Sequence, residues 1–139
     1  MIKRENLIGA WRLIAFEAET DDGEVVLPYS DSPDGRLIYT ESGIMSAHLG
    51  ASGRPGFADM GASGGARAVA AMKSHFSYAG RWRLDGDRVI HDVDMSIFPD
   101  WVGAEKIRTV AFDDGDMILT DNDPTGPLRV GRLRWRREE

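Results

Sequence analysis

Apolar and polar residues alternate along most of this chain in short runs, and turn-forming residues separate one run from the next. A period of two is typical of strands that bury one face and expose the other. Turn clusters such as Asp85-Gly86 punctuate the pattern, because glycine accepts a positive φ and aspartate bonds to its own backbone. The pattern predicts a mainly β, antiparallel protein with nine strands, over residues 9–19, 24–28, 36–40, 44–49, 76–84, 87–97, 104–112, 117–121 and 128–137.

One stretch interrupts the alternation. Residues 50–65, GASGRPGFADMGASGG, include six glycines and are not expected to form regular structure. Residues 66–75, ARAVAAMKSH, predict one short helix, because they are rich in alanine and place Val69 and Met72 at helical spacing. A loop with a helix inserted between strands is interpreted either as a lid over a binding site or as a plain surface excursion.

Turn chemistry also predicts how strands pair. A two-residue turn at Asp85-Gly86 would pair Gly80 with His91 and place the apolar side chains of both strands on one inward face. Turns at 41–43 and 113–116 give two further hairpins with apolar pairs on one face. The predicted inward pairs are Trp82–Val89, Tyr78–Val93, Phe76–Met95, Tyr39–Met45, Leu37–Ala47, Phe112–Met117, Val110–Leu119 and Arg108–Asp121, with His48 facing outward opposite Arg36.

Composition narrows the class of protein. The 139 residues suit a single domain over 1–139, and 42% hydrophobic with 29% charged residues is ordinary for a globular protein. A net charge of −6 argues against a nucleic-acid partner, and no apolar run is long enough to predict a membrane span. The absence of cysteine excludes disulfides and thiol chemistry, and favours a cytoplasmic location. A homodimer is left open.

Two polar pairs fall on the predicted inward face. His91 lies near Tyr78, and the pair is interpreted either as a ligand-binding or proton-shuttling group or as a buried histidine satisfied by a neighbour. Arg108 is costly to bury unless paired, so it either forms a structural ion pair with Asp121 or receives an acidic group of a ligand. The three histidines fall in different places, so neither a metal nor another cofactor is expected.

The start of the first strand, LIGAWRLIAFEAE, contains Gly9-x-Trp11 and resembles the lipocalin signature. The blocks GRLIYTESGIMSAHL, FSYAGRWRL and MSIFPDWVGAEKIRTV are similar to those of bacterial lipocalin-like domain proteins. The resemblance implies an up-and-down antiparallel barrel of about eight to nine strands with one short inserted helix. It also implies that Trp11 closes one end, covered by an arginine of the last strand: Arg132, Arg134 or Arg136.

The resemblance implies binding of a small, largely hydrophobic molecule, and the inward polar groups suggest that it carries a polar or acidic group. An alternative is a cofactor-independent acid–base enzyme, an isomerase, cyclase or dehydratase, with His91 and Tyr78 as catalytic residues. A third option is a filled barrel that acts through its surface. The aromatics of FPDWVG, 98–103, are expected either to surround the barrel mouth or to anchor their loop. The predicted ligand-binding residues are His91, Tyr78, Arg108, Tyr39, Trp82, Met45, Met95, Trp101 and Phe112.

Overall fold

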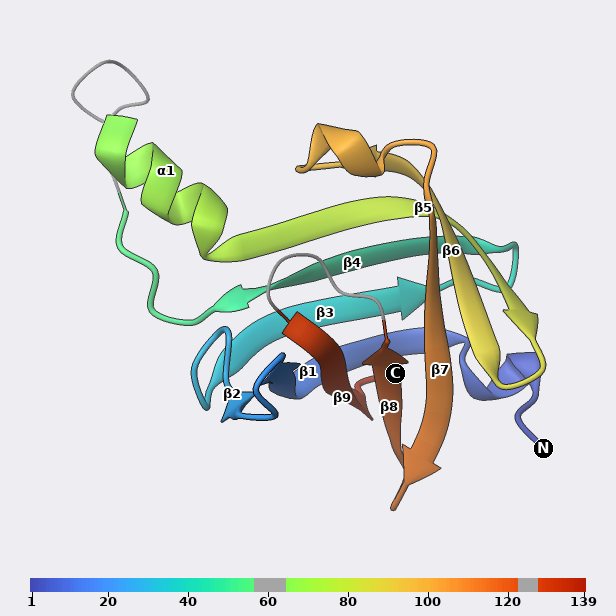
Figure 1. The fold of residues 1–139 in the computed structure, drawn as a ribbon. Coiled ribbons are helices and arrows are strands. Elements are labelled where there is room, and N and C mark those ends of the chain that lie inside the picture. Colours follow the sequence, from blue (N-terminus) through green and yellow to red (C-terminus); the bar gives the residue numbers. More distant parts are fainter. Residues whose placement is uncertain (57–64, 123–127) are drawn as a thin grey trace.

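The structure is a computed structural model that describes residues 1–56, 65–122 and 128–139. Its strands follow the predicted order (Figure 1). They are β1 (Gly9–Thr20), β2 (Val25–Val26), β3 (Pro33–Tyr39), β4 (Ile44–Ala51), β5 (His75–Asp85), β6 (Arg88–Ser96), β7 (Glu105–Asp113), β8 (Asp116–Asp121) and β9 (Leu128–Arg137). The helical elements are α1 (Gly65–Lys73) and the short 3-10 turns η1 (Arg4–Asn6) and η3 (Pro99–Trp101).

The sheet closes into a barrel. Each strand from β3 to β9 pairs antiparallel with its neighbour in sequence, and β1 pairs with both β3 and β9. The short strand β2 lies outside this ring and pairs only with the end of β1, at Ala18 and Glu19. The protein is therefore a closed eight-stranded barrel with one extra strand and one short α-helix, which confirms the predicted fold class.

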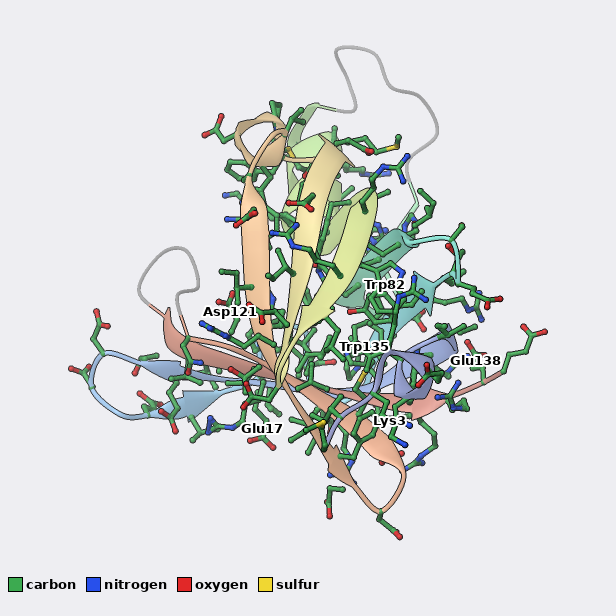
Figure 2. All side chains as sticks on the ribbon, turned by 90° about the vertical axis from the view of Figure 1, so that its right-hand side faces the viewer. Lys3, Glu17, Trp82, Asp121, Trp135 and Glu138 are labelled. Atoms are coloured by element: carbon green, nitrogen blue, oxygen red, sulfur yellow. The ribbon has the colours of Figure 1, made fainter. Side chains whose placement is uncertain are left out.

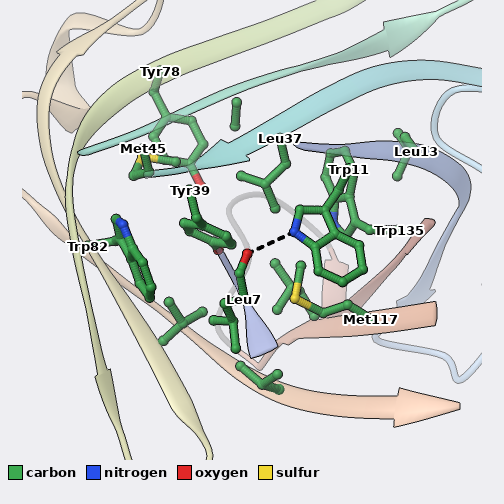
Figure 3. Close-up of a cluster of buried hydrophobic side chains, with 14 of the residues drawn as sticks. Leu7, Trp11, Leu13, Leu37, Tyr39, Met45, Tyr78, Trp82, Met117 and Trp135 are labelled. Atoms are coloured by element: carbon green, nitrogen blue, oxygen red, sulfur yellow. Dashed lines mark hydrogen bonds between the residues drawn. The ribbon is translucent and has the colours of Figure 1, made fainter. Parts of the chain in front are cut away.

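The core fills one end of the barrel. The indole N–H of Trp11 donates to the Leu7 carbonyl at 2.9 Å, which links β1 to the segment that follows η1 (Figure 3). Figure 2 shows Trp82 and Trp135 inside the barrel and Glu17 and Glu138 outside it. The largest fully buried side chains are Trp11, Trp135, Tyr39, Leu7, Leu37, Met45, Met117, His91 and Val89.

Two predicted hairpin registers are confirmed. In the β3–β4 hairpin, Tyr39 pairs with Met45, and Arg36 pairs with the outward-facing His48. In the β7–β8 hairpin, Phe112 pairs with Met117 and Val110 with Leu119, as the four-residue turn requires. In both hairpins, the register that the turn length requires is also the register that places the apolar pairs on one face.

The β5–β6 register differs from the prediction. The turn residues are Gly86 and Asp87, so Trp82, not Gly80, lies opposite His91. A displacement of two residues leaves the predicted inward faces unchanged as far as Val93. Beyond it a β-bulge disturbs the register, and Met95 is 62% exposed instead of inward.

The chain has a second Gly-x-Trp, Gly80-Arg81-Trp82, and arginines cover the tryptophans of both motifs at the same end of the barrel. The guanidinium of Arg137 lies 4.2 Å from the Trp11 ring, and Arg4 lies 4.6 Å from the Trp82 ring. The expectation that Arg132, Arg134 or Arg136 covers Trp11 is wrong. Those side chains alternate with the inward Trp135 and therefore face outward, whereas position 137 shares the face of Trp135.

The opposite end carries the long connections. The predicted helix at 66–75 is confirmed as α1, which precedes β5 and buries none of its side chains (Figure 1). Most of the glycine-rich stretch 50–65, predicted as a lid or a surface excursion, lies outside the described residues. In the described part of the chain, no helix has the length and apolar character needed to cross a lipid bilayer.

Candidate functional site

A cavity of about 160 Å³ lies inside the barrel, toward the end with the long connections. Its wall is mainly aromatic and aliphatic, with a small group of polar side chains set into it. Such a wall is typical of sites for small molecules. The lining residues are Phe16, Tyr29, Leu37, Ala47, Leu49, Phe76, Tyr78, His91, Trp101, Arg108, Leu119, Asp121, Gly131, Leu133 and Trp135.

His91 on β6 is held between two tyrosines. The hydroxyl of Tyr39 on β3 lies 2.6 Å from Nε2, and the hydroxyl of Tyr78 on β5 lies 2.7 Å from Nδ1. The predicted contact between His91 and Tyr78 is thus confirmed, whereas the part of Tyr39 in satisfying this histidine is new. Of these three residues, Tyr78 and His91 line the cavity, whereas Tyr39 lies behind them in the core.

The hydrogen-bond inventory fixes the direction of this chain of donors. A neutral imidazole has one N–H donor and one acceptor nitrogen. Among the described residues, His91 is the one hydrogen-bond partner found for the buried Tyr39 hydroxyl, so Tyr39 donates to Nε2. Nδ1–H then donates to the oxygen of Tyr78. The side chain of Arg108 also donates to the oxygen of Tyr78. This assignment leaves the hydroxyl proton of Tyr78 for a partner in or beside the cavity.

Burial keeps these three groups uncharged. It lowers the pKa of His91 to about 3, and the positive charge of Arg108 acts in the same direction. Burial also raises the pKa of Tyr39 and of Tyr78, although Arg108 partly opposes the shift at Tyr78. At neutral pH the site therefore presents a neutral imidazole and two protonated hydroxyls.

Arg108 on β7 is the buried cation of the cavity, with 8% of its surface exposed. Its Nη1 lies 3.6 Å from a carboxylate oxygen of Asp121 and donates to the Ile107 carbonyl at 3.1 Å. The predicted proximity of Arg108 and Asp121 is confirmed. Both residues also line an outer hollow of about 350 Å³, at the point where the pairing of β7 with β8 ends.

The nine predicted ligand-binding residues fall into three groups. His91, Tyr78, Arg108 and Trp101 line the cavity, and Trp101 packs 4.6 Å from Phe76 between ring centroids. The remaining five do not line it. Tyr39, Met45 and Trp82 belong to the buried core, whereas Phe112 is 38% exposed near Trp11 and Met95 is turned outward by the bulge.

The sequence analysis missed part of the cavity wall. Trp135 lines the cavity, and so do Phe16 and Tyr29, whose ring centroids are 5.7 Å apart. A usable signal was present for Trp135, because the last strand alternates Leu133 and Trp135 with arginines. No comparable signal marks Tyr29, which comes from the connection between β2 and β3. Within the described residues, no group of three or more metal-ligating side chains is found.

The chain is similar to one protein family and to several solved structures. A family described as "Lipocalin-like domain" matches residues 8–138. No curated protein matches the sequence. Two solved structures are similar: an uncharacterized protein from Bacteroides eggerthii (18% identity, TM-score 0.46, covering 94% of this chain and 98% of that chain); and a mutant of the fluorescent protein UnaG (12% identity, TM-score 0.45, covering 98% and 99%). Because the family match spans nearly the whole chain, this protein belongs to the lipocalin-like domain family.

Proposed function

We propose that the barrel binds one small, largely apolar molecule that carries an acidic group. The observation that supports this most directly is the buried guanidinium of Arg108 in a mainly aromatic and aliphatic wall, in which the polar side chains beside it are Asp121, Tyr78 and His91. A guanidinium suits a carboxylate because both are planar and can form two parallel hydrogen bonds. A cavity of roughly 150 Å³ accepts a benzene-sized guest, so a body of about one ring fits the volume of about 160 Å³ here.

Tyr78 is assigned as the second donor to the acidic group. Its oxygen accepts from Nδ1 of His91 and from the side chain of Arg108, so we assign its own proton to the guest. Asp121 lies 3.6 Å from Arg108, longer than a close charge-assisted hydrogen bond. In this proposal the guest carboxylate receives N–H groups of Arg108 and takes the place of part of the contacts that Arg108 makes with Tyr78 and Asp121.

The site chemistry favours binding over acid–base catalysis. A general acid or base works best when its pKa lies near the working pH. The pKa of His91 lies near 3, and burial raises the pKa of Tyr78 above its ordinary value of 10.0. Neither pKa is therefore close to neutral pH, where an acid–base catalyst would have to work. We therefore do not propose an isomerase, cyclase or dehydratase activity. The cytoplasmic location and the homodimer stay predictions.

Benzoate is a suitable first probe, with benzyl alcohol as its neutral match. We expect saturable quenching or enhancement of tryptophan fluorescence by benzoate, because Trp101 and Trp135 line the cavity. Arg108→Gln should weaken benzoate binding by about tenfold or more, since a hydrogen bond to a charged group is worth about 1.5–3 kcal/mol. Binding of benzyl alcohol should change much less.

Arg132→Gln is the matched control, because Arg132 pairs with Glu19 away from the cavity. It should bind benzoate as the wild type does. Equal affinity for benzoate and benzyl alcohol, or equal loss in the two arginine variants, would contradict the assignment of the acidic group to Arg108. Native mass spectrometry of the purified protein would then show directly whether a small molecule of another class accompanies it.

A further inference from the structure

A second hollow, of about 340 Å³, lies on the outer face of the barrel and shares no residue with the internal cavity. Pairing of β1 with β3 and of β3 with β4 places Arg12, Arg36 and His48 in one row across three strands. His75, at the start of β5, and Arg54, in the connection after β4, complete the hollow. Five basic side chains from neighbouring segments therefore converge at one place.

Gly50 makes this convergence possible. A Cβ atom at this position would lie 2.5 Å from the Ser74 carbonyl oxygen and 3.0 Å from Cα of His75. The missing side chain lets the start of β5 lie close against β4, where the ring centroids of His48 and His75 are 5.9 Å apart. Arg54 is fixed at the edge by hydrogen bonds to Ser74 Oγ at 3.0 Å and to the Ala71 carbonyl at 2.6 Å.

The positive charge here is only partly neutralised. Glu138 accepts two hydrogen bonds from Arg36, at 2.8 and 3.3 Å, and Asp34 lies 3.8 Å from Arg12. Among the described residues, no carboxylate lies within ion-pair distance of Arg54, whose donors engage a hydroxyl and a carbonyl. The same holds for His48 and His75. Asp34 is the one carboxylate that lines the hollow.

The charge distribution along the chain points to the same region. Residues 42–84 contain five Lys and Arg residues and one acidic residue, whereas the whole chain has a net charge of −6. The remainder of the chain therefore carries an excess of ten negative charges. Arg83, near the far end of β5, is paired with Asp92 and Glu105. An anion is therefore attracted to the part of the β4–α1–β5 segment (Figure 1) that carries Arg54 and both outer histidines.

We propose that this outer hollow binds a phosphate-type oxyanion, with Arg54, His48 and His75 as its donors. A guanidinium binds phosphate oxygens with well-directed hydrogen bonds, and a protonated imidazole adds a donor and a charge. The anion is either a free phosphate or the phosphate of a lipid headgroup, because both present the same oxygens. Arg12 and Arg36 add positive potential, whereas Asp34 and Glu138 oppose it.

The site should bind more tightly as the pH falls below neutrality. Partial burial lowers the pKa of His75, and the positive charges of Arg54 and His48 lower it further. A bound oxyanion counters those charges and favours the protonated ring, so binding and protonation reinforce each other. The pKa of His75 should therefore rise when the anion is present.

Histidine NMR tests this directly, with inorganic phosphate and sulfate as probes and chloride at equal ionic strength as reference. Sulfate keeps a constant charge over the titrated range, which separates titration of the protein from that of phosphate. The chain has three histidines, and the buried His91 is an internal control. We expect the resonances of His48 and His75 to move and the pKa of His75 to rise, whereas His91 stays unchanged. Unchanged resonances of both outer histidines, with an unchanged titration of His75, would overturn the proposal.

Variants with opposite expected effects localise the site. Arg54→Gln should weaken phosphate binding at least about fivefold by removing charge-assisted hydrogen bonds. Asp34→Asn should strengthen it by removing the carboxylate that lines the hollow. Arg81→Gln, on an exposed position of β5 outside the hollow, is the matched control and should leave phosphate affinity unchanged.

Because Asp34 does not anchor α1, its variant remains informative if Arg54→Gln is poorly folded. Equal affinities across the series would refute the assignment.

Vesicles distinguish the two sources of the anion. Sedimentation with phosphatidylcholine vesicles, with and without phosphatidate, should show binding that depends on phosphatidate and on Arg54 if the source is a lipid headgroup. Binding of inorganic phosphate without vesicle binding assigns the site to a free phosphate. Failure of both probes would leave the proposal without support and overturn it.

Discussion

At the residue scale, His91 shows how a titratable group becomes part of a core. It is 1% exposed, and both ring nitrogens have hydroxyl partners. Its pKa in the folded protein is about 3, below the ordinary value of 6.5. Between these two values the unfolded chain binds a proton that the folded protein does not, so folding stability falls as the pH decreases from 6.5.

The contribution of His91 to the slope of the unfolding free energy against pH reaches about 1.4 kcal/mol per pH unit. Urea unfolding between pH 7 and 5 should therefore show a loss of stability in the wild type that is smaller in His91→Gln. The exposed Arg81 provides the control, since arginine stays charged over this range and Arg81→Gln should retain the wild-type slope. Parallel slopes in the wild type and His91→Gln would show that the folded protein protonates His91 normally.

Two buried tryptophans allow a second comparison between residues. Trp11 and Trp135 are both almost fully buried, but the indole N–H of Trp11 donates to the Leu7 carbonyl, whereas that of Trp135 has no partner in the described residues. Trp11→Phe should cost about 1–3 kcal/mol in unfolding free energy beyond the loss of volume, because it leaves a carbonyl unsatisfied. Trp135→Phe should cost clearly less in the same urea experiment. A larger cost for Trp135→Phe would indicate a partner for its N–H.

At the element scale, Gly80 determines how β5 and β6 pair. A Cβ atom at this position would collide with the Asp92 carbonyl oxygen, because the β-bulge brings the two backbones together there. Gly80→Ala should therefore destabilise the protein by about 1–3 kcal/mol through overpacking. Gly56→Ala is the control, since nothing lies within 4 Å of its Cβ position. Equal thermal midpoints for the two variants would argue against a close approach at the bulge.

Turn spacing and alternation were sufficient to predict all nine strands and the inward face of most of them. They worked because an error of two residues, as in the β5–β6 turn, preserves which side chains face inward. The bulge that turns Met95 outward inserts a single residue, and no local pattern of apolar residues marks it. Gly80 was the available sign, since an isolated glycine inside a strand often indicates a bulge or a close backbone approach.

The candidate site was predictable only in part for a related reason. Strand alternation reports that Arg108 and His91 face inward, but it does not report depth along the barrel axis. Depth separates the cavity wall from the filled end, where Met45 and Trp82 lie. Tyr29 enters the wall from an irregular connection, to which periodicity does not apply.

At the scale of the whole molecule, one end of the barrel is packed with side chains and the other holds the cavity. One end is filled by the tryptophans of both Gly-x-Trp motifs and is covered by Arg4 and Arg137. The other end holds the cavity with Arg108 and Tyr78. Stability and binding should therefore respond to different substitutions at the two ends, whereas Leu37, Ala47, Tyr78, Leu119 and Trp135 belong both to the core and to the cavity wall.

Arg137 tests this separation. Its guanidinium covers Trp11 and donates to the carbonyls of Asn6 and Ile8, at 2.8 and 2.7 Å, so it joins the last strand to the segment before β1. Arg137→Ala should lower the free energy of unfolding by about 1–2 kcal/mol. Arg132→Ala loses a partly exposed ion pair and should lower it by about 0.5 kcal/mol. Neither change should alter benzoate affinity, because neither side chain reaches the cavity. Loss of benzoate binding in Arg137→Ala, under conditions where it remains folded, would mean that the filled end also controls the shape of the cavity.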